Sequence, residues 1–152
     1  MTVLREYEYE DHTADIKIVG YGNTPKRAIE ALILGMFNII YDNEKVEKKE
    51  SKQFVIEGKN ILEIIYNVAK ICLEDVFYKD KFAVRDIRVK NLKKVRIESK
   101  KYKWVCRFEV YGEKYDKEKH GFKKEVKAVT LHDINITKIM KTYWSTEIVV
   151  DV

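Results

Sequence analysis

"TPKRAIEALILGMFNII", residues 24–40, decides how the fold is built, because it joins a helix start signal to a long apolar repeat. Thr24 can cap a helix whose first position is Pro25, where the missing N–H of proline costs no hydrogen bond. Apolar residues then recur in steps of three and four, which predicts one continuous buried stripe. The stripe consists of Ala28, Ile29, Leu32, Ile33, Met36, Phe37 and Ile40. The segment carries Glu30 and is shorter than the ~20 residues that cross a bilayer, so we expect a core helix.

A second helix is predicted over residues 61–78. Asn60 and Glu63, three positions apart, are typical of a capping pair at a helix start. The apolar residues of the expected inner face follow at helical spacing. They are Leu62, Ile65, Tyr66, Ala69, Cys72, Leu73, Val76 and Phe77. Between the two helices, the charged run at 43–52 indicates a surface loop, and a short strand follows at 53–57.

Short alternating runs of residues that favour β-strands fill the rest of the chain. They lie at residues 82–89, 93–99, 103–112, 125–131, 133–137 and 146–152. Within 104–110, apolar and charged residues alternate, as expected for a sheet with one face in water. Together these elements predict an α+β fold in which a mostly antiparallel β-sheet packs with two long α-helices. At 152 residues the chain fits a single domain, residues 1–152.

Composition and charge narrow the class of protein. Hydrophobic residues make up 45% of the chain, too many for a disordered protein, and charged residues make up 36%, too many for a membrane protein. The formal net charge of +5 permits RNA contact, but acids interrupt most of the basic runs, which favours a solvated surface over a nucleic-acid groove. Cys72 and Cys106 form no disulfide framework or metal pair, and the N-terminus lacks a secretion signal, so we expect a cytoplasmic protein.

Three aspartates form a candidate site from the two ends of the sequence. Asp11 and Asp15 are four residues apart, a separation that leaves both on one face of an extended chain unless residues 12–14 form a turn. Alternation in residues 147–152 turns Asp151 away from the core. If the first and last strands are neighbours, the three carboxylates converge, and a proton or a hard divalent cation such as Mg²⁺ or Ca²⁺ must relieve their repulsion. In the alternative interpretation, the acids cap turns and pair with nearby lysines.

Lys127 and the histidines offer weaker signals. Lys127 lies in the middle of the predicted strand 125–131, either as a solvent-facing residue or as a cation that lies beside the carboxylates and can touch a phosphate. His12 is more typical of a hydrogen-bonded structural residue than of a metal ligand. His120 and His132 lack the spacing of a zinc site. No nucleophile-and-base pattern or phosphate-binding glycine loop can be read, so nothing argues strongly for an independent enzyme.

Three segments carry a family resemblance over nearly the whole chain. Residues 7–42 contain a DHTAD segment, a strand and a capped helix that ends in a Met-Phe pair. Residues 112–136 contain a charged central hairpin, and residues 147–152, EIVVDV, end in an acid followed by an aliphatic residue. In this order, the three segments resemble the archease family.

The resemblance implies an accessory protein in tRNA processing rather than an enzyme. Archeases cooperate with the RtcB-type RNA ligase, which joins 2′,3′-cyclic phosphate and 5′-hydroxyl ends in tRNA splicing, and they promote its guanylylation and multiple turnover. They also bind a divalent cation through acidic residues, and we expect Ca²⁺ here, with Mg²⁺ and Mn²⁺ as alternatives. By motif, Asp15 and Asp151 would hold the cation with Asp11 beside them. Lys127 would be the basic residue important for activation, and His12 would support the site.

Two other functions stay open at this point. The same carboxylates could activate water in a metal-dependent phosphodiesterase, which predicts cleavage of RNA by the protein alone. An RNA-binding or chaperone module for tRNA-modifying enzymes predicts a salt-sensitive affinity for RNA, tRNA included, that does not depend on Asp15 or Asp151. None of these functions calls for a membrane partner.

Overall fold

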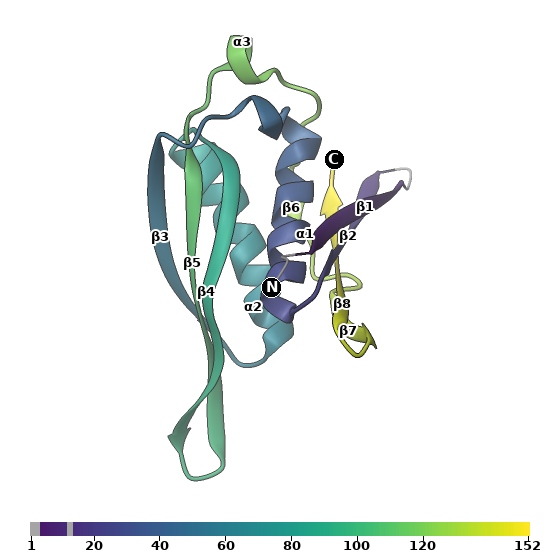
Figure 1. Cartoon of the computed structure of the whole chain (residues 1–152), viewed down its shortest axis with the longest axis vertical. Coiled ribbons are helices and arrows are strands. Elements are labelled where there is room, and N and C mark those ends of the chain that lie inside the picture. Colours follow the sequence, from purple (N-terminus) through teal and green to yellow (C-terminus); the bar gives the residue numbers. More distant parts are fainter. Residues whose placement is uncertain (1–3, 12–13) are drawn as a thin grey trace.

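A computed structural model describes residues 4–11 and 14–152 of the chain. Its two long helices lie between two antiparallel β-sheets, one of five strands and one of three (Figure 1). The predicted α+β class with antiparallel strands and two long helices is therefore confirmed. The strands form two sheets, however, where the sequence suggested a single one.

The elements of each layer come from distant parts of the chain. The larger sheet contains β1 (Arg5–Asp11), β2 (Asp15–Gly22), β6 (Ala128–Val129), β7 (Asn135–Met140) and β8 (Tyr143–Asp151). The smaller sheet contains β3 (Glu50–Gly58), β4 (Phe82–Glu98) and β5 (Lys101–Lys114). The helices are α1 (Pro25–Ile40), α2 (Ile61–Ile71) and the short α3 (Lys117–His120), with a 3₁₀ turn η1 (Asn43–Lys45) and a π-helical segment η2 (Cys72–Lys79). The strand orders are β1-β2-β8-β6, with β7 also paired to β8, and β3-β5-β4.

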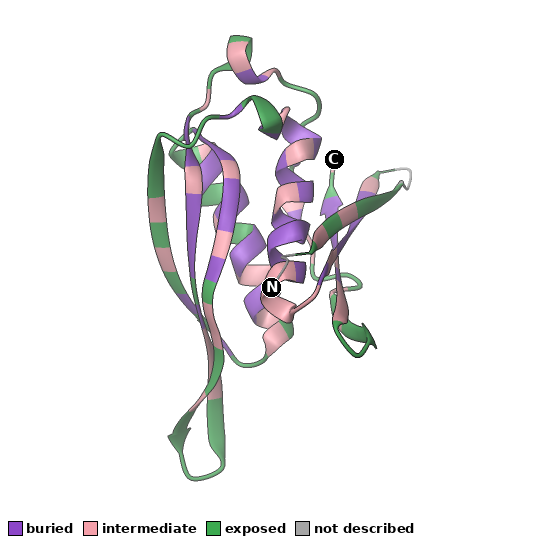
Figure 2. Cartoon of the chain, in the orientation of Figure 1, coloured by how far each residue is buried: buried purple, intermediate pink, exposed green. Residues whose placement is uncertain are grey.

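The burial of α1 explains why the strands divide into two sheets. The helix begins as predicted, since Pro25 opens it and the Thr24 hydroxyl accepts a hydrogen bond from the N–H of Arg27 at 3.2 Å. Its buried residues are not confined to one stripe (Figure 2), and a helix that is apolar on most sides must be covered on most sides. Strands β1, β2 and β8 cover it from the larger sheet and β4 from the smaller. Gly20 allows the close approach of β2, because a Cβ atom there would lie 2.5 Å from the carbonyl oxygen of Ala28.

The second predicted helix is confirmed in extent but changes its winding. The side chain of Asn60 accepts a hydrogen bond from the N–H of Glu63 at 2.9 Å and so caps α2 as expected. From Cys72 onwards the segment continues as the π-helical η2, which ends at Lys79. Apolar spacing predicts a helix here and cannot distinguish the two windings. Among the described residues, no helix is long and apolar enough to cross a membrane.

The strands of the structure differ from the predicted ones in three main ways. The runs 82–89 and 93–99 belong to one strand, β4, because β-bulges let it pair with β5 over its whole length. The predicted strand 125–131 is reduced to Ala128–Val129, since the carbonyl of Val126 accepts a hydrogen bond from the Tyr78 hydroxyl at 2.5 Å instead of joining a ladder. Strand β1 was not predicted, although its glutamates alternate with tyrosines.

A buried ion-pair network ties both sheets to α1. Glu30 of α1 is fully buried and accepts hydrogen bonds from Arg5 of β1 at 3.3 Å and from the N–H of Val89 in β4 at 2.7 Å. It also pairs with Arg27, while Arg5 bridges to Asp86 at 2.9 Å. Burial raises the pKa of Glu30, and the Val89 N–H and the arginines oppose that shift. The network therefore connects β1, α1 and β4 through buried polar groups.

Candidate metal centre

Strands β2 and β8 bring two of the predicted site residues together. Asp15, the first residue of β2, lies directly opposite Asp151, the last residue of β8. Directly opposed residues of an antiparallel pair share one face, with Cβ atoms about 4.5–5.5 Å apart. The next pair, Ile16 and Val150, is buried on the core side, so the two aspartates lie on the other face. The structure thus places these carboxylates side by side at the end of the sheet.

One oxygen of this pair lacks a partner. Asp15 Oδ1 is buried, and no hydrogen-bond donor lies within reach of it in the described part of the chain. A buried carboxylate oxygen without a donor is costly, and the neighbouring Asp151 carboxylate adds repulsion. A hard cation removes both costs, because Ca²⁺ and Mg²⁺ prefer carboxylate oxygens as ligands. The chemistry of the pair therefore fits a divalent cation.

The remaining predicted acid, Asp11, belongs to a neighbouring strand of the sheet rather than to the strand of Asp15. Asp11 ends β1 and lies opposite Ile16 of β2 in the antiparallel ladder. Because the chain reverses direction between Asp11 and Asp15, the two residues lie in neighbouring antiparallel strands, which is the alternative that the sequence left open for this segment. His12 lies outside the described residues.

The backbone of Lys127 is hydrogen-bonded to the aspartate pair. Its N–H donates a hydrogen bond to the carbonyl of Asp151 at 2.8 Å, its side chain is exposed, and the following residue, Ala128, lies opposite Asp151. On the other side, the N–H of Val152 donates to the carbonyl of Ala14 at 3.3 Å. Backbone hydrogen bonds from both neighbouring segments therefore fix the position of Asp151.

The two aspartates do not complete a coordination shell by themselves. Over the described side chains, which exclude those of Asp11 and His12, no group of three His, Cys, Asp or Glu residues could hold a metal ion. Calcium takes six to eight oxygen ligands and magnesium takes six. A cation between Asp15 and Asp151 would therefore keep positions open for water, backbone oxygens or the oxygens of another molecule.

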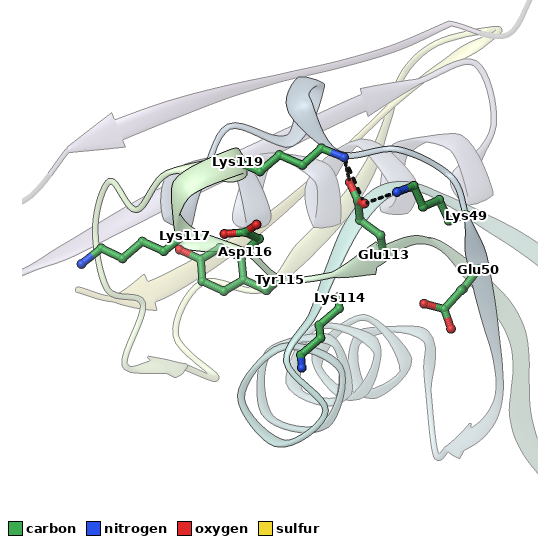
Figure 3. Close-up of a pocket in the computed structure, with 8 residues that line it drawn as sticks. All are labelled: Lys49, Glu50, Glu113, Lys114, Tyr115, Asp116, Lys117 and Lys119. Atoms are coloured by element: carbon green, nitrogen blue, oxygen red, sulfur yellow. Dashed lines mark hydrogen bonds and ion pairs between the residues drawn. The ribbon is translucent and has the colours of Figure 1, made fainter.

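A second polar cluster, which the sequence did not predict, surrounds His120. Asp116 caps α3 by accepting from the N–H of Glu118 at 3.0 Å, and Gly121 ends the helix with a φ of 78°. His120 Nδ1 accepts a hydrogen bond from the N–H of Asp116, so its Nε2–H donates to Glu113, each at 3.0 Å. A hollow of about 650 Å³ lies beside this cluster (Figure 3). Its lining residues are Lys49, Glu50, Glu113, Lys114, Tyr115, Asp116, Lys117 and Lys119.

The Glu113 carboxylate is held in its ionised form. The N–H of Glu47 donates to it at 2.8 Å, and His120 and Lys119 donate as well. These bonds lower the pKa of Glu113 to about 2. Because Lys119 and Lys49 both pair with Glu113, the inner wall of the hollow is neutralised by its own ion pairs (Figure 3). The cluster anchors α3 and offers less unpaired charge than its lysines suggest.

The depressed pKa of Glu113 predicts an acid-sensitive part of the stability. An acid whose pKa is lower in the folded state stabilises the fold above its ordinary pKa, here 4.5, and this contribution is lost as the pH falls towards about 2. We expect Glu113→Gln to be less stable than the wild type at neutral pH and to lose less stability over this range. Urea unfolding along a pH series measures this, with the exposed Glu74→Gln as the matched control. Parallel pH profiles of wild type and Glu113→Gln would contradict the assignment.

Comparisons with known proteins agree over almost the whole chain. The sequence pattern of the archease protein family matches residues 7–152. Protein archease of Pyrococcus furiosus is 38% identical over 151 residues, which cover 98% of this chain and 100% of the relative. Protein archease of Pyrococcus abyssi is 35% identical with the same coverage. The solution structure of protein 1598 of Methanobacterium thermoautotrophicum, 23% identical, has the same fold, with a TM-score of 0.75 over 96% of this chain and 98% of that one. This chain therefore belongs to the archease family.

Proposed function

We propose that this archease is a metal-binding accessory protein that activates an RtcB-type RNA ligase in tRNA splicing by promoting its guanylylation and multiple turnover. The observation that carries the proposal is the position of Asp15 opposite Asp151, with a buried Asp15 oxygen that has no donor among the described residues. Membership of the archease family supports an accessory role. In this proposal the ligase performs the catalysis, and no residue of this chain is catalytic.

Asp15 and Asp151 would hold the cation with Asp11 beside them, and His12 would support the site. Bound Ca²⁺, or Mg²⁺ or Mn²⁺ in its place, would supply positive charge and open coordination positions for water or phosphate oxygens. The chain itself prepares this arrangement, because the β2–β8 ladder and the hydrogen bond from the Lys127 N–H hold Asp151 in place. The carboxylates are thus positioned before a cation arrives.

The site lies where a partner can reach it. Asp151 and Lys127 are exposed, so the end of the sheet can enter a cleft of the ligase that binds metal and nucleotide. To activate the ligase, this end must bind its nucleotide-accepting state more tightly than its other states, because equal affinity shifts no equilibrium. Lys127 would contact a phosphate or the ligase in that state.

The test is multiple-turnover ligation by the cognate RNA ligase with GTP and divalent metal. We expect the wild-type protein to stimulate turnover, and Asp15→Asn and Asp151→Asn to leave it at the level of the ligase alone. The exposed Asp75 of η2 provides a matched control, since Asp75→Asn makes the same chemical change away from the site. Lys127→Gln is expected to reduce stimulation without reducing cation affinity. Circular dichroism verifies that each variant is folded.

Two results would replace this proposal. Equal stimulation by the wild type and both site variants would return the aspartates to a structural role. Metal-dependent cleavage of RNA by the protein alone, abolished by Asp15→Asn, would identify a phosphodiesterase instead.

A further inference from the structure

The hairpin of β4 and β5 extends beyond the rest of the smaller sheet. Strand β3 ends at Gly58, which lies opposite Trp104 of β5. Past that point only β4 and β5 pair with each other. We call residues 93–104, which comprise this two-stranded ribbon and the residues at its base, the arm. The arm projects from one end of the molecule, opposite the end that carries α3 (Figure 1), and most of it is exposed (Figure 2).

The arm carries almost only positive charge. Its cations are Lys93, Lys94, Arg96, Lys100, Lys101 and Lys103, and its single acid is Glu98. Lys101 pairs with Glu98 at 3.2 Å, and Lys103 pairs with Glu57 of β3 at 3.0 Å. No carboxylate of the described residues lies within 4.0 Å of the other four cations, all of which are exposed. The arm therefore presents unneutralised positive charge to solvent.

Aromatic rings lie among these cations on one face. The β4–β5 register sets Lys94 opposite Trp104 and Arg96 opposite Tyr102, so all four side chains share a face. The Tyr102 side chain is 48% exposed, and Lys94 Nζ lies 4.7 Å from the centre of its ring. A hollow of about 310 Å³ borders the same ring and the exposed Ile97. At the base of the arm it is also lined by Gly58, Lys59, Lys103 and two carboxylates, Glu57 and Glu63. This face offers cations and a flat apolar surface together.

Protection against aggregation explains only part of this pattern. Lysines on edge strands prevent sheets from pairing with one another, and both strands of the arm have a free edge beyond Gly58. Protection of an edge strand needs charge, but the charge can have either sign. The exposed Tyr102 and Ile97 would weaken this protection. The combination is typical of surfaces that bind single-stranded nucleic acids, where cations follow the phosphates and exposed rings stack on bases.

We propose that the arm binds single-stranded RNA, with Lys94 and Arg96 facing phosphates and Tyr102 stacking on a base. The choice of RNA over DNA rests on the proposed function. Binding itself needs neither the ligase nor the aspartate pair, so it can be tested on the isolated protein. A failure of this proposal leaves the ligase assay unaffected.

The test measures the affinity of the purified protein for a fluorescent oligouridine by anisotropy over a salt series. For single strands, the slope of log K against log salt changes by about 0.7 for each phosphate contact. We therefore expect the double variant Lys94→Gln, Arg96→Gln to bind more weakly and to flatten the slope by about 1.4. Tyr102→Ala is expected to lose about fivefold or more in affinity with an unchanged slope, and Tyr102→Phe to retain the affinity.

A matched control removes the same charge at the other end of the molecule. Lys114→Gln with Lys117→Gln, beside the hollow in Figure 3, also lowers the net charge by two, and both lysines are exposed. We expect this pair to leave the slope unchanged. A second variant replaces residues 94–104 by Asn-Gly, which joins Lys93 to Val105 through a two-residue hairpin turn. It keeps the three-stranded part of the sheet as far as the pair of Glu57 and Val105.

Several outcomes would overturn the proposal. It is wrong if the shortened arm binds oligouridine as tightly as the wild type, or if the control pair flattens the slope as much as the arm pair. Equal competition by duplex RNA would rule out stacking on Tyr102. If polyglutamate competes as well as oligouridine, the arm recognises acidic polymers in general. If the protein binds a single-stranded DNA oligomer of matching sequence more tightly than oligouridine, the assignment to RNA is wrong.

Discussion

Replacing Glu30 by alanine is expected to lower the free energy of unfolding by about 3–5 kcal/mol, because it leaves buried charges and a buried donor without their partner. Glu30 is fully buried, and its carboxylate accepts from Arg5, Arg27 and the N–H of Val89. These groups come from β1, α1 and β4, so the loss weakens the attachment of both sheets to the helix. Urea unfolding followed by circular dichroism measures the change.

Two further variants test the physical reason. Glu30→Gln should cost less than Glu30→Ala, because its amide oxygen can still accept from the Val89 N–H although the arginines remain unneutralised. Glu74→Ala removes an exposed glutamate from η2 and should change the free energy of unfolding by no more than about 0.5 kcal/mol. If Glu30→Ala changed the free energy of unfolding as little as Glu74→Ala, the network would not contribute measurably to stability.

Addition of Ca²⁺ at one hundred times its dissociation constant is expected to raise the free energy of unfolding by about 2.7 kcal/mol, because the proposed site exists only in the folded protein, where Asp15 and Asp151 are held together. In a chain of 152 residues, this corresponds to a rise in Tm of roughly 5–11 °C. Asp15→Asn and Asp151→Asn should lose the rise. Thermal unfolding with and without cation measures the effect.

The variants should also differ before any cation is added. Without cation, Asp15→Asn is expected to be at least as stable as the wild type, since it removes the repulsion between two facing carboxylates. Asp75→Asn should keep the full cation-induced rise. The metal centre is wrong if Ca²⁺, Mg²⁺ and Mn²⁺ all leave the Tm of the wild type unchanged, or if both site variants still respond.

The sequence predicts local features of this fold well. The start of α1 at Pro25 and of α2 at Ile61 follows from Thr24 and Asn60, whose side chains bond to backbone groups only three residues away. The outward position of Asp151 likewise follows from simple alternation in the last strand. Such features depend on neighbours within one turn or one strand and are therefore present in the sequence itself.

Features that depend on distant neighbours were predicted incompletely. Apolar spacing in α1 identified one buried stripe, whereas the helix is covered by two sheets, because beyond Arg27 its remaining sides also lack charge except at the buried Glu30. The pairing of Asp15 with Asp151 was predicted only under the condition that the first and last predicted strands are neighbours, and the sequence alone could not show that β2 pairs with β8. The arm escaped prediction since its basic runs become one surface only when β4 pairs with β5.

The central place of β8 in the larger sheet also has a consequence for the order of folding. Strands β1 and β2 and helix α1 are close in sequence and can associate early. The other neighbour of β2 in the sheet, β8, lies more than a hundred residues further along the chain. Contacts over such separations form slowly. The facing aspartates are then among the last groups to come together. In a refolding experiment, the time at which the protein begins to bind the cation would therefore report when β2 pairs with β8.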